Sequence, residues 1–482
     1  MITFVIALVA LIAGYFIYGS LVEKWFGIDE TAETPAVKFN DGVDFVPMPA
    51  WRIFMIQFLN IAGLGPIFGA IMGALYGPAA FLWIVFGCIF AGAVHDFFSG
   101  MLSIRHDGAS IPEVVGQYLG NGVKQFMRGF SVILLLLVGV VFILGPAGIL
   151  STLADNNHWP VFLQNKTLWL IVILLYYIAA TMLPVDKVIG KIYPVFGAAL
   201  LIMAFGLLIS LLVQHPPIPN LTLDTLGNMH SKADSQPLFP MLFITIACGA
   251  ISGFHSTQSP MMARCMKSER LGRRIFYGAM ITEGIVALIW AATAMSFWGG
   301  VQELNDTIPT LTGNKAATAV NIICSTWLGK VGGVLAILGV IACPITSGDT
   351  AFRSARLIVA DFTHLCQKSI RKRLLVSVPL FVIALIVTNL DFTIIWRYFG
   401  FSNQTLSVIV LWAAAVYMAK QNKNYWIVVI PAAFMTAVCS TYILLAPEGL
   451  RLAPKIAYPL GGLTTVILLG LFFFKAVRKT AT

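Results

Sequence analysis

The sequence contains unusually few charged residues. Charged residues make up 11% of the 482 residues, against about 25% in a typical soluble domain. Hydrophobic residues make up 58%, and the mean hydropathy is +0.86. So little polar surface cannot cover a water-soluble globule of this size. The composition excludes a soluble domain and predicts an integral membrane protein.

The sequence also lacks the patterns that mark disulfide scaffolds and metal centres. Its seven cysteines form no C-x-x-C pair, and most lie in apolar runs, where they are expected to be small buried side chains. No H-E-x-x-H pattern occurs, so we expect no metal site and no cofactor beyond a coupling ion. No convincing signal-peptide cleavage site follows the first apolar run, which we interpret as a retained span.

Long apolar runs predict thirteen transmembrane helices. Runs of this length are typical of helices rather than of β-barrel strands, so the expected class is an all-α polytopic membrane protein. The expected spans are residues 2–20, 52–76, 79–102, 127–150, 167–183, 188–213, 238–262, 274–298, 331–351, 374–390, 394–419, 425–446 and 457–477.

The basic residues fall mainly in alternate loops between these spans. Of the 31 lysines and arginines, 24 lie on one side of the expected membrane and seven on the other. Cytoplasmic loops carry the excess of basic residues, which places the N-terminus outside and the C-terminus in the cytoplasm. This distribution also accounts for the net charge of +10, so no nucleic-acid partner is expected.

Two of the spans are interrupted by glycine, polar residues and proline. These are "FLNIAGLGPIFGAI" (58–71) in the second span and "GAISGFHSTQSP" (249–260) in the seventh. Five spans separate them, so they start on opposite sides of the membrane. Paired broken helices of this kind indicate an inverted-repeat transporter, although proline and glycine in one helix alone often mean only a kink.

The inverted-repeat interpretation divides the chain into four parts. A LeuT-like core of two five-helix repeats would span residues 51–213 and 238–419. Residues 1–50 would add a first helix and a cytoplasmic loop, and residues 420–482 two further helices and a tail. The extracellular loop 299–330 contains a short apolar piece that suits an interfacial or re-entrant helix, where LeuT-type folds carry a helical lid.

Ionisable side chains within the spans are functional hypotheses, because charge is costly in a membrane. Glu283 lies near mid-bilayer in the eighth span, where a carboxyl can carry a proton, or serve as a neutral hydrogen-bonding group. His95 and Asp96 lie in the inner third of the third span. They can relay protons or close a gate, or form a structural pair.

The broken helices are the expected substrate site. The seventh span is expected to unwind at His255 to Ser259, which would offer amides and the positive end of the following half-helix to a carboxylate. Asn403 and Gln404 of the eleventh span can donate hydrogen bonds there, or simply link helices. The expected substrate-binding residues are Asn60, Gly63, Gly65, Gly253, His255, Ser256, Thr257, Gln258, Asn403 and Gln404.

The ninth span offers hydroxyl groups to a cation. Thr346 and Ser347 could form a sodium site with backbone carbonyls of Ala62 or Gly65, because hard oxygen ligands suit small cations, or could bond back to their own helix. Asp349 is grouped with them as an ion-coupling residue. Arg353 lies four residues on, on the same helix face, and we expect it to act in a cytoplasmic gate, pairing with Asp349 or with nearby loops.

Several ordered motifs resemble the carbon starvation protein A family. They are "HDFFSGMLSIRHDGASIPEVV" (95–115), "ACGAISGFHSTQSP" (247–260), "TEGIVALI" (282–289), "SGDTAFRSARLIVAD" (347–361) and "WRYFGFSNQTLS" (396–407). The resemblance implies a bacterial inner-membrane carrier with a LeuT-like fold that takes up peptides or, in some members, pyruvate. It also places Gly253, His255, Ser256, Glu283, Asp349, Arg353, Asn403 and Gln404 at motif positions.

The leading hypothesis is a symporter for a small carboxylate-bearing nutrient, driven by a proton or sodium gradient. Short peptides are the first expected substrate and pyruvate the alternative. A membrane sensor or a channel is less favoured, because no soluble signalling domain follows the spans. A hydrolase using Ser256 or Ser259 with His255 is also disfavoured, because adjacent residues rarely provide nucleophile–base geometry.

Overall fold

The fold was analysed in a computed structural model, which describes residues 1–156, 158–182, 189–312, 314–367, 369–390 and 392–477. The described residues are helical, with connecting loops and no β-strand. The expected all-α class is therefore confirmed. Some positions used above lie outside the described residues. They are four of the counted basic residues (Lys187, Lys368, Arg478 and Lys479) and the ends of two expected spans at 183 and 188.

The first half of the chain forms helices that match the first six expected spans. They are α1 (Ile2–Phe16), α2 (Tyr18–Phe26), α3 (Pro35–Lys38), α4 (Ala50–Ile61), η1 (Gly65–Gly69), α5 (Ala70–Gly73), η2 (Ala74–Tyr76), α6 (Ala79–Leu82), η3 (Trp83–Gly92), α7 (Ala93–Arg105), α8 (Ile111–Leu119), α9 (Asn121–Asn156), α10 (Val161–Gln164), α11 (Lys166–Met182) and α12 (Ile189–Gln214).

The second half begins with the other interrupted span. Its helices are η4 (Leu238–Leu242), α13 (Phe243–Thr245), α14 (Gly253–Ala263), η5 (Glu269–Leu271), η6 (Arg273–Tyr277), α15 (Gly278–Phe297), α16 (Val301–Thr307), η7 (Ile308–Thr310), α17 (Lys315–Trp327), α18 (Gly329–Ile337), η8 (Leu338–Ala342), α19 (Cys343–Thr363), α20 (Ile370–Val387), α21 (Phe392–Lys420), α22 (Trp426–Leu445), α23 (Pro454–Phe472) and η9 (Phe473–Val477).

Many of these helices can cross a membrane. Within the described residues, eight are long and apolar enough, and a ninth is counted if the bent pair Ala50–Ile61 and Gly65–Tyr76 is one span. Lys166–Met182 is a shorter apolar helix. The protein is therefore a multi-pass membrane protein, while the count of thirteen and the five-plus-five repeat stay predictions.

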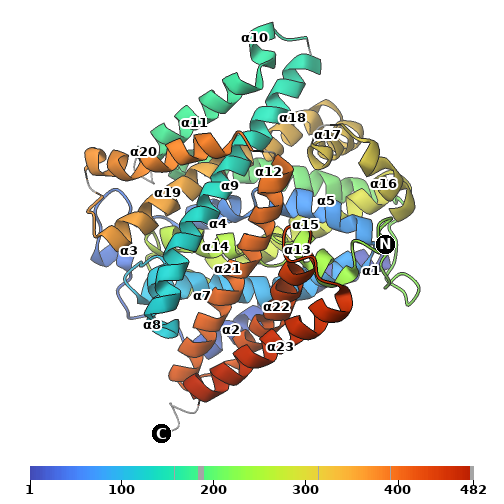
Figure 1. Cartoon of the computed structure of the whole chain (residues 1–482). Coiled ribbons are helices and arrows are strands. Elements are labelled where there is room, and N and C mark those ends of the chain that lie inside the picture. The colour runs from blue at the N-terminus through green and yellow to red at the C-terminus, as the bar shows by residue number, and fades with distance from the viewer. Residues whose placement is uncertain (157, 183–188, 313, 368, 391, 478–482) are drawn as a thin grey trace.

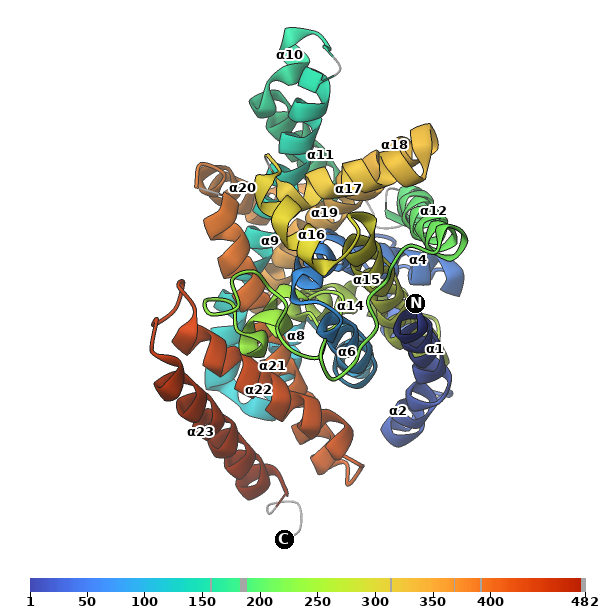
Figure 2. The same cartoon turned by 90° about the vertical axis from the view of Figure 1, so that its right-hand side faces the viewer.

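The helices differ in how far the rest of the protein encloses them. The most apolar window of the segment Glu269–Phe297, which contains α15, is 89% buried, whereas that of Pro454–Val477 is 17% buried. Both views place α14 and α15 in the middle of the molecule and α23 at its edge (Figures 1 and 2). The central helices carry the polar residues singled out from the sequence, so those residues are held inside a helical shell.

Both interrupted spans are broken in the structure. The second span bends by 53° between Ala50–Ile61 and Gly65–Tyr76. The seventh span leaves the helical conformation from 246 to 252, between α13 and α14. The short apolar piece expected in the 299–330 loop is also helical and forms most of α17.

Candidate functional site

The two breaks lie against each other at the centre of the molecule. A side chain added to Gly65 would place its Cβ 2.2 Å from the Cβ of Cys248, which lies in the unwound part of the seventh span. Only glycine permits so close an approach of the two segments. Gly65 therefore serves the packing of one break on the other, and its expected role in substrate binding stays a prediction.

The unwound residues of the seventh span lie earlier than the sequence suggested. His255 to Ser259 were expected to unwind, but the break ends at Ser252 and α14 begins at Gly253. The Ser256 hydroxyl donates to the Gly253 carbonyl, and the Thr257 hydroxyl to the Phe254 carbonyl. The expectation failed because these hydroxyls satisfy themselves within the first turns of a helix, as serine and threonine do near helix starts.

Asn403 and Gln404 of α21 hold the break from outside. The Asn403 Oδ1 accepts the Phe254 amide at 2.6 Å and the Ser252 hydroxyl at 3.1 Å. The Gln404 Nε2 donates to the Ile251 carbonyl at 2.8 Å. Asn403 is thus an N-cap supplied by another helix, and it occupies a backbone amide that was expected to bind a substrate carboxylate.

Four ionisable side chains from three helices form one buried array. Asp96 of α7 lies at its centre: its Oδ1 is 2.8 Å from the Nδ1 of His95, and its Oδ2 is 2.9 Å from the Nδ1 of His255. The Nε2 of His255 then lies 3.5 Å from the Oε2 of Glu283 on α15. All four side chains are fully buried. The sequence had named His95 and Asp96 together as a relay or gate, His255 as a substrate-binding residue and Glu283 as a proton carrier. The structure joins them.

The array has a defined proton capacity. An ionised carboxylate only accepts hydrogen bonds, so Asp96 fixes a proton on the Nδ1 of both imidazoles. This leaves the Nε2 of His255 facing Glu283, and a proton can move between them without changing the charge of the array. With both imidazoles neutral, the two carboxylates carry two negative charges, and two bound protons restore neutrality in a setting where unpaired charge is costly.

Several buried polar atoms of α4 and α15 have no hydrogen-bond partner among the described residues. They include both side-chain polar atoms of Asn60 and both carboxylate oxygens of Glu283. The Trp290 Nε1 and the Thr293 hydroxyl, on the same helix as Glu283, are also without partners there. Buried polar groups are almost always satisfied, so this set has capacity for a ligand. The sequence analysis missed Trp290 and Thr293, whose spacing from Glu283 puts all three on one helix face.

The two hydroxyl residues of the expected sodium site, Thr346 and Ser347, lie on α19. The Ser347 hydroxyl donates to the Leu59 carbonyl at 3.1 Å, beside the first break. The Thr346 hydroxyl instead donates to the Cys343 carbonyl of its own helix. The Cys343 sulfur lies 3.6 Å from the Ala62 carbonyl oxygen and 3.9 Å from that of Gly63. A soft thiol therefore lies among the carbonyls that were expected to bind a hard cation.

Asp349 is bound by tyrosines that the sequence analysis did not single out. Its Oδ2 accepts the Tyr176 hydroxyl of α11 at 3.0 Å and also the Tyr193 hydroxyl of α12. Its Oδ1 has no hydrogen-bond partner within the described residues. Asp349 therefore ties α19 to two neighbouring helices. Nothing in the spacing of 176, 193 and 349 along the sequence indicates this contact.

Arg353 forms an ion pair with a loop near the expected cytoplasmic face. This is the second of the two partners expected for it, Asp349 or a nearby loop. The Nη1 of Arg353 lies 3.4 Å from the Oδ1 of Asp44, and the Nη2 of Arg356 lies 3.2 Å from the same oxygen. Its Nη2 also donates to the Ala180 carbonyl at 2.6 Å. Burial raises the pKa of Asp44, but the guanidinium groups of Arg356 and Arg353 outweigh this effect and hold that pKa below its ordinary value.

Asp44 belongs to residues 27–49, here called the strap, which connect α2 to α4. The Thr34 hydroxyl of the strap donates to the Met266 carbonyl, and the Met48 amide donates to the Cys265 carbonyl at 3.1 Å. The strap therefore crosses the end of α14 and is bound to α19 by Asp44. Sequence reasoning missed it because Asp44 lies outside every apolar run.

Comparisons with known proteins give first a similar fold and then a family. The fold resembles that of a manganese transporter from Eremococcus coleocola, with a TM-score of 0.51 and 12% identity, covering 91% of this chain and 99% of that one. The chain therefore has the fold of a known helical membrane transporter. The family model "Carbon starvation protein CstA" matches residues 1–162, 122–332 and 329–442, and the chain belongs to this family.

Named relatives agree with the family. An uncharacterized membrane protein of Haemophilus influenzae is 48% identical over 64% of this chain and 94% of its own length. The peptide transporter CstA of Campylobacter jejuni is 25% identical over 88% of this chain and 76% of its own length. The pyruvate/proton symporter BtsT of Escherichia coli is 26% identical over 60% of this chain and 48% of its own length.

Proposed function

We propose that the protein is a proton-driven symporter that imports a small carboxylate-bearing nutrient across the bacterial inner membrane. Short peptides are the first substrate class, because several relatives over most of the chain are named peptide transporters. Pyruvate is the second, because the match to BtsT covers only 60% of this chain and 48% of the length of BtsT. The buried His95–Asp96–His255–Glu283 array is the observation that carries the proposal.

The array supports protons as the coupling ion. The array links α7 and α15 to α14, the half-helix that follows the break. A change in its protonation therefore changes the attraction between these three helices. In the proposed cycle a proton from outside binds the Glu283 carboxylate, passes to the Nε2 of His255, and leaves to the inside when the helices separate. Asp96 compensates the imidazolium charge throughout, as a carboxylate beside a histidine does in other proton-transfer sites.

Sodium is the less supported coupling ion. Of the two expected hydroxyl ligands, only that of Ser347 reaches another helix, at the Leu59 carbonyl of α4, and it also lies 3.1 Å from the Cys343 carbonyl of its own helix. The thiol of Cys343 faces the remaining carbonyls, and thiols are poor ligands for a small hard cation.

Alternating access requires a part that opens toward each side. The breaks at 62–64 and 246–252 provide hinges between half-helices, as in inverted-repeat transporters with repeats at 51–213 and 238–419. The strap and its Asp44 ion pairs are the proposed inner gate, which has to release α19 before substrate can leave. The substrate then lies near Asn60 and Glu283, whose side-chain polar atoms have no hydrogen-bond partner in the part of the chain that the structure describes.

A hydrolase is not supported by the same geometry. The Ser256 hydroxyl donates to the Gly253 carbonyl, and the Ser259 hydroxyl to the His255 carbonyl, so neither is bound to an imidazole nitrogen. Activation of a serine requires a base within hydrogen-bond reach of its hydroxyl. His255 is bound through Nδ1 to Asp96 instead.

Uptake by the purified protein in proteoliposomes tests the proposed function. Labelled di- and tripeptides and labelled pyruvate are offered under an inward proton gradient, an inward sodium gradient, or no gradient. We expect the proton gradient to drive accumulation of peptide above equilibrium, and the sodium gradient to have no effect. Accumulation of pyruvate alone would replace peptide as the substrate, and the absence of gradient-driven uptake of any substrate would refute symport.

A further inference from the structure

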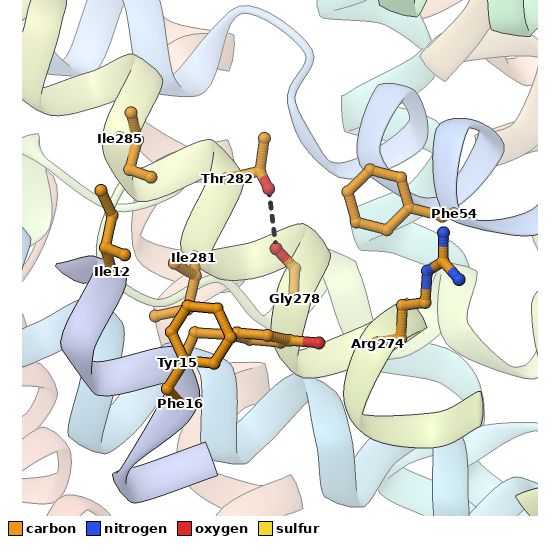
Figure 3. Close-up of a pocket in the computed structure, with 9 residues that line it drawn as sticks. All are labelled: Ile12, Tyr15, Phe16, Phe54, Arg274, Gly278, Ile281, Thr282 and Ile285. Atoms are coloured by element: carbon orange, nitrogen blue, oxygen red, sulfur yellow. Dashed lines mark hydrogen bonds between the residues drawn. The ribbon is translucent and has the colours of Figure 1, made fainter. Parts of the chain in front are cut away.

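A groove on the membrane-facing surface of the protein is separate from the central site. It has a volume of about 320 Å³ and lies between α1, α4 and the segment formed by η6 and α15 (Figure 3). Its lining residues are Ile12, Tyr15, Phe16, Phe54, Arg274, Gly278, Ile281, Thr282 and Ile285. All of its walls belong to expected transmembrane helices, so the medium it meets is the bilayer.

The groove is apolar along its length and basic at one end. Arg274 and Ile285 are eleven residues apart on one helical segment, which corresponds to roughly 16 Å along its axis. The far end is lined by Ile285 and by Ile12, whose side chain is 44% exposed. A ligand that fits this groove has a charged end and a long apolar part.

The arginine at the basic end is available to a ligand. Arg274 is exposed, and within the described part of the chain its guanidinium makes no hydrogen bond or ion pair. Its neighbour Arg273 is engaged, with its Nε 3.2 Å from a carboxylate oxygen of Glu23 and its guanidinium over the Tyr15 ring. A guanidinium binds a phosphodiester through paired hydrogen bonds, and so complements a phospholipid headgroup.

The floor of the groove depends on a glycine. A Cβ on Gly278 would lie 3.2 Å from Tyr15 and 3.8 Å from Phe54, so a side chain there would fill the space between α1 and α4. The Thr282 hydroxyl is bound to the Gly278 carbonyl and therefore presents little polarity to the groove (Figure 3). The wall beyond Arg274 is thus suited to an acyl chain.

We propose that this groove binds one anionic phospholipid, with the headgroup phosphate on Arg274 and an acyl chain along Ile281 and Ile285. Arg274 lies on the side of the membrane that the basic residues mark as cytoplasmic, where anionic lipids attract basic residues. The lipid occupies the space between the first helix and the two central helices α4 and α15. This site is independent of the proposed transport function.

Thermal unfolding of the purified protein tests the lipid site. The probes are phosphatidylglycerol, phosphatidylcholine and inorganic phosphate, added to protein in neutral detergent. We expect a saturable rise in the unfolding midpoint with phosphatidylglycerol for the unaltered protein. Arg274→Gln should weaken the apparent affinity at least about tenfold, as loss of a charge-assisted contact does. The groove-filling Ile285→Trp should also weaken it, because the larger side chain occupies the space proposed for the acyl chain.

Lys372→Gln is the matched control, because Lys372 is another exposed basic residue at the expected cytoplasmic face. It should leave the phosphatidylglycerol response unchanged. Equal responses in Arg274→Gln and the unaltered protein would overturn the proposal. So would an equal response to phosphatidylcholine, or an Arg274-dependent response to phosphate alone. Ile285→Trp retains the arginine, so a folding defect in one variant does not decide the outcome.

Discussion

The sulfur of Cys343 lies close to backbone carbonyls of the first break. It faces the carbonyl oxygens of Ala62 and Gly63 at the first break, where a sodium site would need oxygen ligands. Thr346 is directed back at its own helix. The residue that decides the chemistry of this position is thus neither of the two hydroxyl residues named from the sequence.

We therefore predict that uptake does not need sodium. Replacing sodium by choline should leave the rate unchanged, and Thr346→Ala should lie within about twofold of the unaltered protein, because back-bonded hydroxyls contribute little. Initial uptake rates in proteoliposomes measure both. Sodium-dependent uptake that Thr346→Ala weakens would restore the sodium site.

Asn403 is a structural residue of the break. Asn403→Ala removes the acceptor for the Phe254 amide and the Ser252 hydroxyl, and should destabilise the protein by about 1–2 kcal/mol. The midpoint of thermal unfolding in detergent should fall. Thr405→Ala is the control, because its hydroxyl donates only to the Phe401 carbonyl of the same helix. Equal midpoints for the two variants would show that the cap contributes nothing.

The members of the array could be named from the sequence, but their meeting could not. Buried ionisable residues in apolar runs are conspicuous, which identified His95, Asp96, His255 and Glu283 one by one. Asp96 and His255 are 159 residues apart, and no helical or loop spacing relates them. Tyrosines such as Tyr176 were missed for the opposite reason, because an aromatic residue in an apolar run is unremarkable until its hydroxyl finds a carboxylate.

At the scale of the elements, buried ion pairs hold the strap against α19. Two fully buried arginines share the carboxylate of Asp44, and removing one partner of a buried pair typically costs about 3–5 kcal/mol. The exposed pair between Lys38 and Asp107, also made by the strap, is worth far less. The hold of the strap on α19 therefore depends on Asp44.

We predict that Asp44→Asn releases the strap and exposes Cys265 beneath it. Cys265 is buried, whereas Cys366 is exposed, so the measurement uses a Cys366→Ser background and a maleimide reagent. Labelling of Cys265 should become at least about tenfold faster, given the cost of breaking a buried pair. Asp107→Asn is the control and should not change the rate. Equal labelling in both variants would remove Asp44 from the gate.

The same contact should resist mild acid. The pKa of Asp44 is lower in the folded protein than in the unfolded chain, where it is about 3.9. The stabilisation is therefore present above the unfolded pKa and is lost only as the pH falls through the lower folded pKa. Slow Cys265 labelling should persist from pH 7 to about pH 5. A rise in labelling within that range would contradict the assignment.

The position of each break could be predicted only approximately. Glycine and proline mark where a helical pattern is broken in the sequence. Which residues unwind depends on the groups that form hydrogen bonds with the freed backbone. In the seventh span Asn403 and Gln404 capture Phe254 and Ile251, and so fix the start of α14 at Gly253. Those partners come from a helix about 150 residues away in the sequence.

At the scale of the whole molecule, the distribution of basic residues predicts the orientation. The C-terminus should lie in the cytoplasm and the loop 215–237 outside. A fluorescent-protein fusion after residue 477 should fluoresce, and an alkaline phosphatase fusion at the same point should be inactive. Insertion of the phosphatase at residue 226 should give activity. The reverse pattern would invert the proposed direction of every gate.

The whole molecule combines buried central helices with more exposed outer helices. The central helices carry the array and the breaks, while α1 and α23 are the more exposed (Figure 2). The multi-pass membrane class followed from hydropathy alone, because runs this long and apolar are what a bilayer crossing needs. The number of membrane crossings did not, since shorter or charged helices such as α20 do not meet the criteria for a span by themselves.

The central claim is that protons drive transport through Glu283, and one comparison tests it most directly. The Glu283→Gln variant and the unaltered protein are reconstituted, and each is assayed for uptake under an inward proton gradient and for substrate counterflow without one. We predict that the variant loses proton-driven uptake and retains counterflow, because glutamine keeps the shape of the side chain but cannot exchange a proton. Proton-driven uptake of equal rate in both proteins would contradict the account.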